Sequence, residues 1–256
     1  MSKPKSITKI LVDGDIICYR AAAGTEGSHP DDTIDKVDTL MNFIVAETVV
    51  FPTSSNLECY LTGKGNFRYE VAKTVPYKGN RKDVVKPTNL PLARQHLMDK
   101  WGAVVSQGEE ADDLIGIASA RGDPETTVVV TIDKDMMQLQ GWNWNFVKDV
   151  WTKISVDEGN KFFYTQILTG DRADNIRGIH GIGPVKAAKV LEGRTTEEEL
   201  YKACVDIYVC HWYADHIDYE YVFPVEDWAE QRVLENARLL WLRRYPNELW
   251  SPPNGG

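Results

Sequence analysis

The stretch "TTVVVTIDKD", residues 126–135, decides the fold class of this chain. Its run of threonine and valine favours a buried strand, because β-branched side chains pack well on a pleated surface. Two carboxylates, Asp133 and Asp135, follow where the strand should end. The stretch "KILVDGD", residues 9–15, has the same form and ends in Asp13 and Asp15. The sequence therefore predicts at least two buried strands that each end in a pair of acids.

Segments with helical spacing of apolar residues separate further strand-like runs. Helices are predicted over 33–51, 92–101 and 109–122, and strands over 57–62 and 102–107. Strands that alternate with helices are typical of an α/β fold with a central, mostly parallel sheet and flanking helices. Beyond residue 150 the pattern becomes helical, with a long helix over 226–245 and a loose tail after it. We expect an α/β core over 1–165 and a helical region over 166–256.

Composition limits the class of protein. The chain has 256 residues, 43% of them hydrophobic, which is enough for a packed core. It contains no apolar run of about 20 residues, and its first residues lack the features of a signal peptide. Its four cysteines show no CxxC spacing, and Cys204, Cys210, His211 and His216 match no standard zinc site. A reduced cytoplasmic protein without membrane association is expected. Core packing is the expected role of the eight tryptophans, with partner binding as the alternative.

Charge is distributed unevenly along the chain. The formal net charge is −9, yet residues 63–94 hold eight basic residues against two acidic ones. This segment is also rich in proline, which predicts a mobile basic arch. An acidic protein can present such a basic face to a polyanion.

The acids lie in four groups. Besides the two pairs that end strands, one group opens the helix over 109–122, and a last pair lies near residue 172. The carboxyl ends of parallel strands share one edge of the sheet, so these groups should converge there. A single aspartate at such a place is usually a turn or cap residue, but four groups together favour a site. The full set is Asp13, Asp15, Glu110, Asp112, Asp113, Asp133, Asp135, Asp171 and Asp174.

This much negative charge is unfavourable unless cations offset it. Oxygen ligands without histidine or thiolate select hard cations, so Mg²⁺ or Mn²⁺ is predicted. The number of carboxylates suits two ions, which is the usual arrangement for phosphodiester hydrolysis.

A glycine-rich segment follows the last acid pair. In "GDRADNIRGIHGIGPVK", residues 170–186, Asp171 and Asp174 should share one helical turn because they are three residues apart. The glycines can expose backbone N–H groups, and Pro184 suits the first turn of a helix whose N-terminus favours anions. A plain helix–helix connection is the alternative, but the adjacent acid pair favours phosphate binding. The predicted phosphate contacts are Gly178, Gly181, Gly183, Lys186 and Lys189.

Taken together, five stretches resemble the 5′-nuclease family, which comprises bacteriophage 5′→3′ exonucleases, the 5′-nuclease domain of bacterial DNA polymerase I, and flap endonucleases. They are "ILVDGDIICYR", "YKGNRK", "EEADDLIG", "TIDKDMMQL" and "LTGDRADNIRGIHGIGPVKAAKVL". They keep the family's order and cover the chain from about residue 7 to 200. The resemblance implies a PIN-like 5′-nuclease fold and a helix–three-turn–helix element for duplex binding at about 174–192.

The resemblance also implies roles for single residues. One metal centre would use Asp13, Glu110, Asp112, Asp113 and Asp133, and a second Asp135, Asp171 and Asp174. Arg20 and Lys78 would act near the cleaved phosphate. Tyr77 would be a base-stacking ring, and Arg81 and Lys82 would contact the DNA backbone.

One position departs from the family. Many members have a metal-binding aspartate just after the second strand, where this chain has Thr62 or Gly63, depending on the alignment gap. Asp15 is a candidate substitute, because alternate residues of a strand share a face with Asp13.

The sequence therefore predicts a metal-dependent 5′→3′ exonuclease and 5′-flap endonuclease of DNA replication, with RNase H-like primer removal as a related activity. The expected partners are duplex DNA with a 5′ end or 5′ flap and an RNA–DNA hybrid, bound by a monomer. The expected location is the cytoplasm, or the host cytoplasm if a phage encodes the chain. A DNA-binding protein of the same fold with weakened catalysis is the alternative, favoured by the missing acid.

Overall fold

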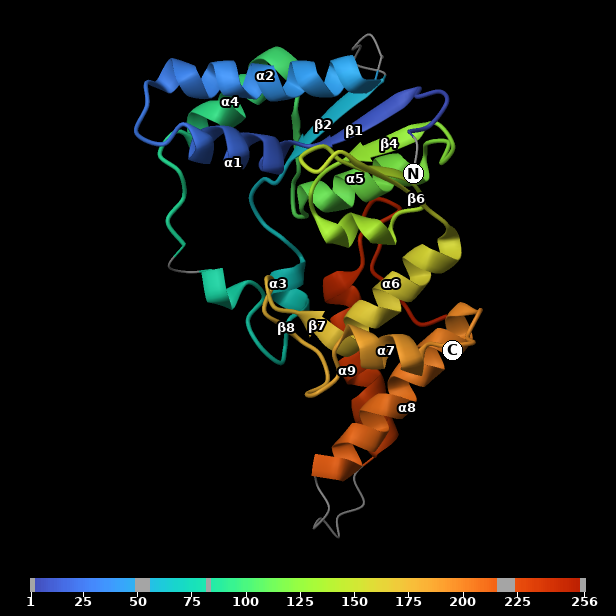
Figure 1. The fold of residues 1–256 in the computed structure, drawn as a ribbon. Coiled ribbons are helices and arrows are strands. Elements are labelled where there is room, and N and C mark those ends of the chain that lie inside the picture. Colours follow the sequence, from blue (N-terminus) through green and yellow to red (C-terminus); the bar gives the residue numbers. More distant parts are fainter. Residues whose placement is uncertain (1–2, 49–55, 82–83, 216–223, 254–256) are drawn as a thin grey trace. The chain divides into compact units, whose positions relative to one another are not determined.

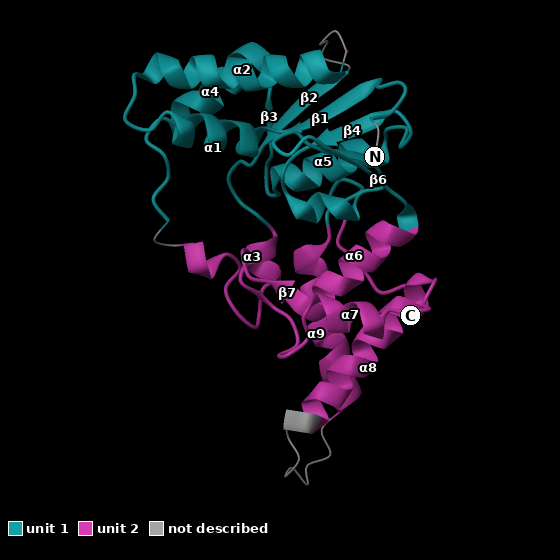
Figure 2. Cartoon of the chain, in the orientation of Figure 1, with its two compact units in different colours: residues 1–66, 84–156, 242–247 teal, residues 67–83, 157–241, 248–256 magenta. Residues whose placement is uncertain are grey.

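The computed structural model describes residues 3–48, 56–81, 84–215 and 224–253. Within them the chain forms two compact units, each built from several segments of sequence (Figure 2). The first unit contains residues 1–66, 84–156 and 242–247, and the second contains 67–83, 157–241 and 248–256. The expected boundary at residue 165 lies inside a helix, and the expected basic arch over 63–94 contributes to both units.

A six-stranded sheet in the order β3-β2-β1-β4-β5-β6 forms the centre of the first unit (Figure 1). All neighbouring strands are parallel except the last pair, which confirms the mostly parallel sheet. The strands are β1 (Lys9–Asp13), β2 (Leu57–Leu61), β3 (Val104–Val105), β4 (Thr127–Val130), β5 (Gly141–Asn145) and β6 (Val150–Ile154).

Helices cover both faces of this sheet, and the strand residues alternate between them. Ile10 and Val12 pack under three helices on one face, whereas Leu11 between them packs on the other. The first face carries α1 (Gly14–Gly24), α2 (Pro30–Thr48) and α4 (Leu90–Trp101). The second carries α5 (Ala111–Ala120) together with Leu242 from the C-terminal part of the chain. Figure 1 shows α2 and α5 on opposite sides of the sheet.

The strands β5 and β6 form a hairpin that the sequence does not predict, and β6 lies where a helical region is expected to begin. Trp144 and Trp151 lie directly opposite each other in it, with ring centroids 4.8 Å apart. Both are buried, so these tryptophans serve core packing. Asp149 makes the turn with a φ of 51° and accepts a hydrogen bond from the indole of Trp144 at 3.0 Å.

The second unit is mainly helical, which agrees with the expected C-terminal region. Its helices are α3 (Arg68–Val71), α6 (Val156–Thr169), α7 (Pro184–Val190), α8 (Glu197–Asp215) and α9 (Val225–Leu240), and a 3₁₀ turn, η1, spans Gly79–Arg81. A small hairpin, β7 (Gly170–Asp171) and β8 (Ile176–Arg177), follows α6. Thr196 and Glu199 form a capping box before α8. No helix among the described residues is both long and apolar enough to span a bilayer.

Two C-terminal expectations are wrong. The last helix, α9, ends at Leu240 instead of continuing to residue 245, and Leu242–Asn247 joins the first unit. The segment after it is not a loose tail, because Trp250 is 5% exposed and packs on Phe163 in the second unit.

Candidate functional site

Asp13 ends β1 and caps α1, so one residue links the sheet to its first helix. Its Oδ1 accepts a hydrogen bond from the backbone N–H of Ile16 at 3.2 Å, and its Oδ2 accepts one from the hydroxyl of Thr131 at 2.8 Å. Only 3% of the residue is exposed. The pKa of Asp13 is raised to about 7, mainly by burial and further by the charges of Asp15 and Asp133, although the two hydrogen bonds act in the opposite direction.

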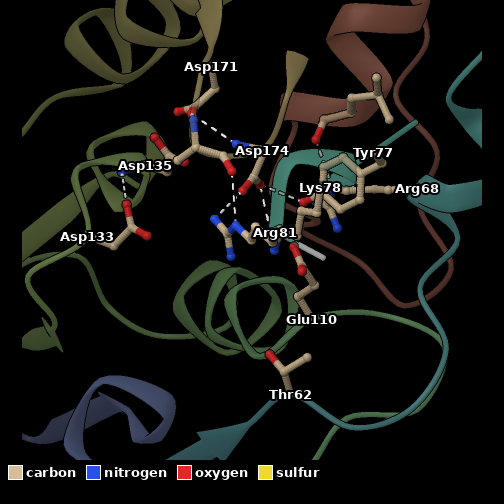
Figure 3. A network of polar contacts seen from close by, with 12 residues as sticks. Thr62, Arg68, Tyr77, Lys78, Arg81, Glu110, Asp133, Asp135, Asp171 and Asp174 are labelled. Carbon is tan, nitrogen blue, oxygen red and sulfur yellow. Dashed lines mark hydrogen bonds and ion pairs between the residues drawn. The ribbon is translucent and has the colours of Figure 1, made fainter. Parts of the chain in front are cut away.

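Thr131 was not singled out from the sequence, although it organises this sheet edge. It donates to Asp13 and accepts from the backbone N–H of Asp133 at 3.0 Å. Asp133 then caps the 3₁₀ turn η2 (Lys134–Gln138) by accepting from the N–H of Asp135 at 2.9 Å (Figure 3). A short chain of hydrogen bonds thus joins the acids at the ends of β1 and β4. The only sequence signal for Thr131 is its place as the first polar residue after a buried valine run.

Two of the acids at the start of α5 cap the helix. Glu110 and Asp113 form a capping box, in which Asp113 Oδ2 accepts from the N–H of Glu110 at 3.0 Å. Asp113 is fully buried, and its Oδ1 accepts from the backbone N–H of Arg243 at 3.3 Å. Its carboxylate therefore holds the helix start in place.

Asp112 lies between these two, and the charges of four other acids act on it. Burial raises the pKa of Asp112 well above its usual range, and the charges of Asp13, Glu110, Asp133 and Asp113 raise it further, in that order. The structure thus brings together Asp13, Glu110, Asp112 and Asp133, which the sequence placed at one sheet edge.

This acidic cluster has donors of the kind that a hard divalent cation prefers. All its donors are carboxylate oxygens, and their mutual repulsion is what a bound cation would relieve. Within the described part of the chain, no three His, Cys, Asp or Glu side chains are arranged as a group that could hold a metal ion. The cluster therefore fits such a cation in its chemistry, but its side chains do not form a closed set of ligands in this structure.

Asp15 has a different position from the one expected. It lies in the first turn of α1, and not on the strand with Asp13. Its Oδ2 accepts from the N–H of Thr62 at 2.9 Å, and its Oδ1 forms an ion pair with Arg94 of α4. Arg94 also donates to the carbonyl of Thr62 at 2.6 Å. Asp15, Thr62 and Arg94 therefore form a polar clamp that fixes the end of β2.

Thr62 itself adds a second function to this clamp. Its hydroxyl accepts from the N–H of Ala111, the first residue of α5, at 3.0 Å. Thr62, one of the two candidate positions for the missing family acid, thus accepts a hydrogen bond from the helix that bears Asp112. Gly63 next to it meets the carbonyl of Ser106 so closely that an added Cβ would lie 2.0 Å from that oxygen.

In the second unit, Asp171 and Asp174 lie on a hairpin turn, so the expectation of one helical turn is wrong. Asp171 ends β7, and its Oδ1 accepts from the N–H groups of Ala173 at 2.6 Å and Asp174 at 3.3 Å. Asn175 closes the turn with a φ of 59°, a conformation that asparagine tolerates better than most residues. The two carboxylates still lie in one tight turn.

Asp174 is surrounded by the three side chains predicted from "YKGNR" (Figure 3). Its Oδ2 accepts from the hydroxyl of Tyr77 at 2.6 Å and lies 3.7 Å from Lys78 Nζ. Its Oδ1 accepts from Arg81 Nη2 at 2.6 Å. The ring of Tyr77 is 3% exposed, so in this structure it is not offered as a stacking surface and instead fixes Asp174.

Backbone contacts hold this basic segment on the hairpin turn. Lys78, in a left-handed conformation with a φ of 53°, donates its N–H to the carbonyl of Asp174 at 2.9 Å. Asn80 donates to the carbonyl of Arg172 at 2.7 Å, and Asn175 donates to the carbonyl of Pro76 at 2.8 Å. These asparagines were missed in the sequence, where they had no pattern beyond that of turn residues.

The glycine-rich segment leads into α7, and Pro184 begins that helix as expected. Gly178 is required by packing, because a Cβ there would lie 2.2 Å from the carbonyl carbon of Thr169. Gly181 has a φ of 75°, and nothing lies near Gly183, which caps α7. The segment therefore combines one structural glycine with two exposed ones.

Three other predicted basic residues are exposed on helices. Arg20 is exposed on α1, and Lys186 and Lys189 are exposed on α7. Lys82 lies outside the described residues. The acids expected to share a second ion are divided, since Asp135 belongs to the first unit and Asp171 and Asp174 belong to the second.

Comparison with known proteins identifies the family to which the chain belongs. Residues 8–172 match the family described as 5′-3′ exonuclease, N-terminal resolvase-like domain, and the chain belongs to this family. It is 30% identical over 221 residues to DNA polymerase I of Bacillus caldotenax, which covers 77% of this chain and 25% of that protein. It is 28% identical to the 5′-3′ exonuclease of Mycoplasma genitalium, over 75% of this chain and 74% of that one. The chain thus spans only about a quarter of the polymerase it matches.

Solved structures confirm the fold. The 5′-exonuclease of bacteriophage T5, in a structure with bound zinc ions, superposes with a TM-score of 0.67 at 18% sequence identity. The match covers 91% of this chain and 88% of the T5 chain. A T5 flap endonuclease in a complex with DNA and metal ions superposes with a TM-score of 0.63 at 16% identity, over 90% and 88% of the two chains.

Proposed function

We propose that this chain is a divalent-metal-dependent 5′→3′ exonuclease and 5′-flap endonuclease that hydrolyses phosphodiester bonds in DNA. The observation that carries the proposal is the acidic cluster of Asp13, Glu110, Asp112 and Asp133 in a chain of the 5′-3′ exonuclease family. Placing these carboxylates together has an unfavourable free energy, which a bound cation would offset. The T5 relatives, solved with bound metal ions, support the same dependence.

Mg²⁺ or Mn²⁺ would be held by this cluster in the first unit. When bound, the metal supplies positive charge that activates water and offsets charge on the phosphate. A second ion, with Asp135, Asp171 and Asp174 as its ligands, completes the two-ion proposal.

The cationic side chains have the complementary task of binding the phosphates. Lys78 is 18% exposed at its side chain and is fixed by its backbone bond to the Asp174 carbonyl, so it can present a positioned ammonium group. Arg20, Arg81 and Lys82 would neutralise neighbouring phosphates. The exposed glycines and the lysines of α7 would bind the backbone of the duplex.

The substrate proposed is duplex DNA with a 5′ end or 5′ flap, and an RNA–DNA hybrid is the proposed substrate for primer removal in DNA replication. A relative named 5′-3′ exonuclease and a T5 flap endonuclease solved with DNA support this choice. The active species proposed is a monomer in the cytoplasm.

A catalytically weakened DNA-binding protein is the second candidate. Thr62 and Gly63 favour it, because neither offers a carboxylate at the family's metal position and Thr62 is already used by α5.

One experiment separates these functions. A duplex with a labelled 5′ flap is incubated with the protein in Mg²⁺, Mn²⁺ or EDTA, in parallel with a blunt duplex and an RNA–DNA hybrid. We expect short 5′ products in either metal and none in EDTA or with Asp112→Asn. Binding without cleavage in both metals would support the weakened protein instead.

A further inference from the structure

The segment that follows α9 returns to the first unit and lies against the acid-bearing helix. Residues 242–244, here called the strap, come about 70 residues after the end of the family match at residue 172. Leu242 is 4% exposed and packs with Ala111 and Ile115 of α5 and with Met136 of η2. The strap is therefore part of the core on the α5 face of the sheet.

The strap contacts the start of α5 through two separate polar bonds. The backbone N–H of Arg243 donates to Asp113 Oδ1 at 3.3 Å, and its guanidinium donates to Glu109 Oε2 at 2.8 Å. The side chains of this ion pair are 10% and 14% exposed, so it is shielded from solvent. Glu109 and Asp113 lie on either side of Glu110 and Asp112, which belong to the acidic cluster. Arg243 thus binds the chain before and after these two acids.

The strap also contacts η2, the turn that carries Asp135. The N–H of Leu242 donates to Gln138 Oε1 at 3.3 Å, and Arg244 Nη2 donates to the Gln138 carbonyl at 3.0 Å. Gln138 is 4% exposed and is the last residue of η2. The strap is therefore bonded to both acid-bearing elements, through Arg243 to the start of α5 and through Leu242 and Arg244 to η2.

The strap packs directly against the backbone of α5. A Cβ on Gly116 of α5 would lie 2.4 Å from the carbonyl oxygen of Arg243, so the two backbones approach as closely as a glycine permits. Any side chain at Gly116 must push the strap away from the helix. The charges of the acids on α5 repel one another. Contacts with the strap oppose this repulsion by fixing the position of the helix.

We propose that the strap positions the carboxylates of α5 and η2, and that Arg243 is a positioning residue for the nuclease reaction. This inference rests on the proposed metal-dependent function. It adds that the metal site is incomplete without a segment outside the part of the chain that matches the family. Residues that orient metal ligands from outside the ligand set commonly change metal affinity by about 10–100-fold when replaced.

Two variants test the proposal from different sides, and neither removes a carboxylate of the cluster. Gly116→Ala displaces the strap backbone, and Arg243→Met removes the bond to Glu109. Gly24→Ala is the matched control for the first, because Gly24 is also helical but an added Cβ meets nothing within 4 Å. Glu125→Gln is the control for the second, since it breaks the exposed Lys153–Glu125 ion pair.

Calcium binding is measured by titration calorimetry on the full chain, with circular dichroism to confirm folding. We expect both variants to bind Ca²⁺ about tenfold more weakly, and the controls to match the wild type. In cleavage assays kcat should fall and the Mg²⁺ requirement should rise, while KM for the flap duplex stays the same. If Arg243→Met does not fold, Glu109→Gln replaces it and keeps a neutral acceptor for Arg243.

Folded variants that bind Ca²⁺ as tightly as the wild type would overturn the role of the strap. A wild type that binds no Ca²⁺ and cleaves nothing in Mg²⁺ would instead overturn the proposed function.

Discussion

Arg81 Nη2 donates to Asp174 Oδ1 at 2.6 Å, so a proposed DNA contact is bonded to a proposed metal ligand. A guanidinium and a metal ion would compete for this carboxylate oxygen. The side chain of Arg81 is 48% exposed, which leaves it free to exchange Asp174 for a phosphate of the nucleic acid.

Arg81→Gln should therefore tighten Ca²⁺ binding while it weakens DNA binding. The gain should be a factor of about 2–5, because a partly exposed ion pair contributes up to about 1 kcal/mol. Calorimetry on the free protein measures the first effect, and flap-duplex titrations in Ca²⁺ measure the second. Arg172→Gln, on the same turn and exposed, is the matched control for loss of charge. Weaker Ca²⁺ binding in Arg81→Gln would argue against competition at Asp174.

The clamp of Asp15, Thr62 and Arg94 gives a second prediction. Asp15→Asn removes the ion pair with Arg94 and should lower the free energy of unfolding by about 1 kcal/mol. Since the carboxylate is already engaged by the clamp, the Mg²⁺ concentration for half-maximal cleavage should not change. Chemical denaturation and a Mg²⁺ titration measure the two quantities. A raised Mg²⁺ requirement would instead support the sequence-based hypothesis that Asp15 replaces the missing family acid.

Gly183 offers a test of the duplex contact that leaves the fold unchanged. An added side chain meets nothing within 4 Å, and aspartate is a favourable residue at the cap of α7. Gly183→Asp should nevertheless weaken duplex binding and reduce its salt dependence, because the new carboxylate repels phosphate. Binding isotherms at several salt concentrations, with Gly183→Ala as the uncharged control, measure this. An equal loss on a short single strand would show that the glycine segment does not select duplex.

Asp38 allows a prediction about pH, on the helices that cover the sheet. Its carboxylate accepts from His96 at 2.9 Å, Lys100 at 2.7 Å and Trp101 at 2.9 Å, all of them on α4. Burial alone would raise its pKa, but these hydrogen bonds outweigh burial and lower the pKa of Asp38 to about 2. A depressed pKa stabilises the folded state above the unfolded value of 3.8, and this contribution is lost as the pH falls from 3.8 toward 2.

Asp38→Asn should therefore destabilise the chain at pH 7 by about 1 kcal/mol, as expected for a partly exposed ion pair. The difference from the wild type should shrink toward zero near pH 2. Denaturant unfolding over this range measures it, and Asp35→Asn, exposed on the same helix, is the control. A difference that is independent of pH would mean that ionisation of Asp38 does not contribute to stability.

The sequence predicted the parts of the fold in which local pattern and tertiary packing agree. The valine run of β4 and the acid after it are one example, since the strand is buried on both faces. In β5 of the β5–β6 hairpin, asparagines alternate with Trp142 and Trp144, which is a strand pattern, but asparagine is rare in strands and weakens the signal. The helix α9 was extended too far because Trp241 and Leu242 continue its helical spacing, but bonds to α5 and η2 draw the chain away.

The acidic site, like the fold, could be predicted from the sequence only in part. Positions at strand ends were predictable, because topology alone places Asp13 and Asp133 at one edge. The hydrogen bonds that divide the acids into roles were not predictable, because they depend on distant partners such as Arg243 for Asp113 and Arg94 for Asp15. Asp171 and Asp174 were assigned to a helix because a spacing of three also occurs in a turn.

The strap has a consequence for how the chain acquires its structure during synthesis. Domains generally fold as units while the chain emerges from the ribosome, at about 5–20 residues per second. Here the N-terminal sheet can form early, but the residues that hold α5 and η2 are made only after α9. Helix α5 must then wait for roughly 120 further residues, which is about 6–24 seconds of translation at that rate. A nascent chain with its first 240 residues exposed would carry every acid of the cluster and still lack its final contacts.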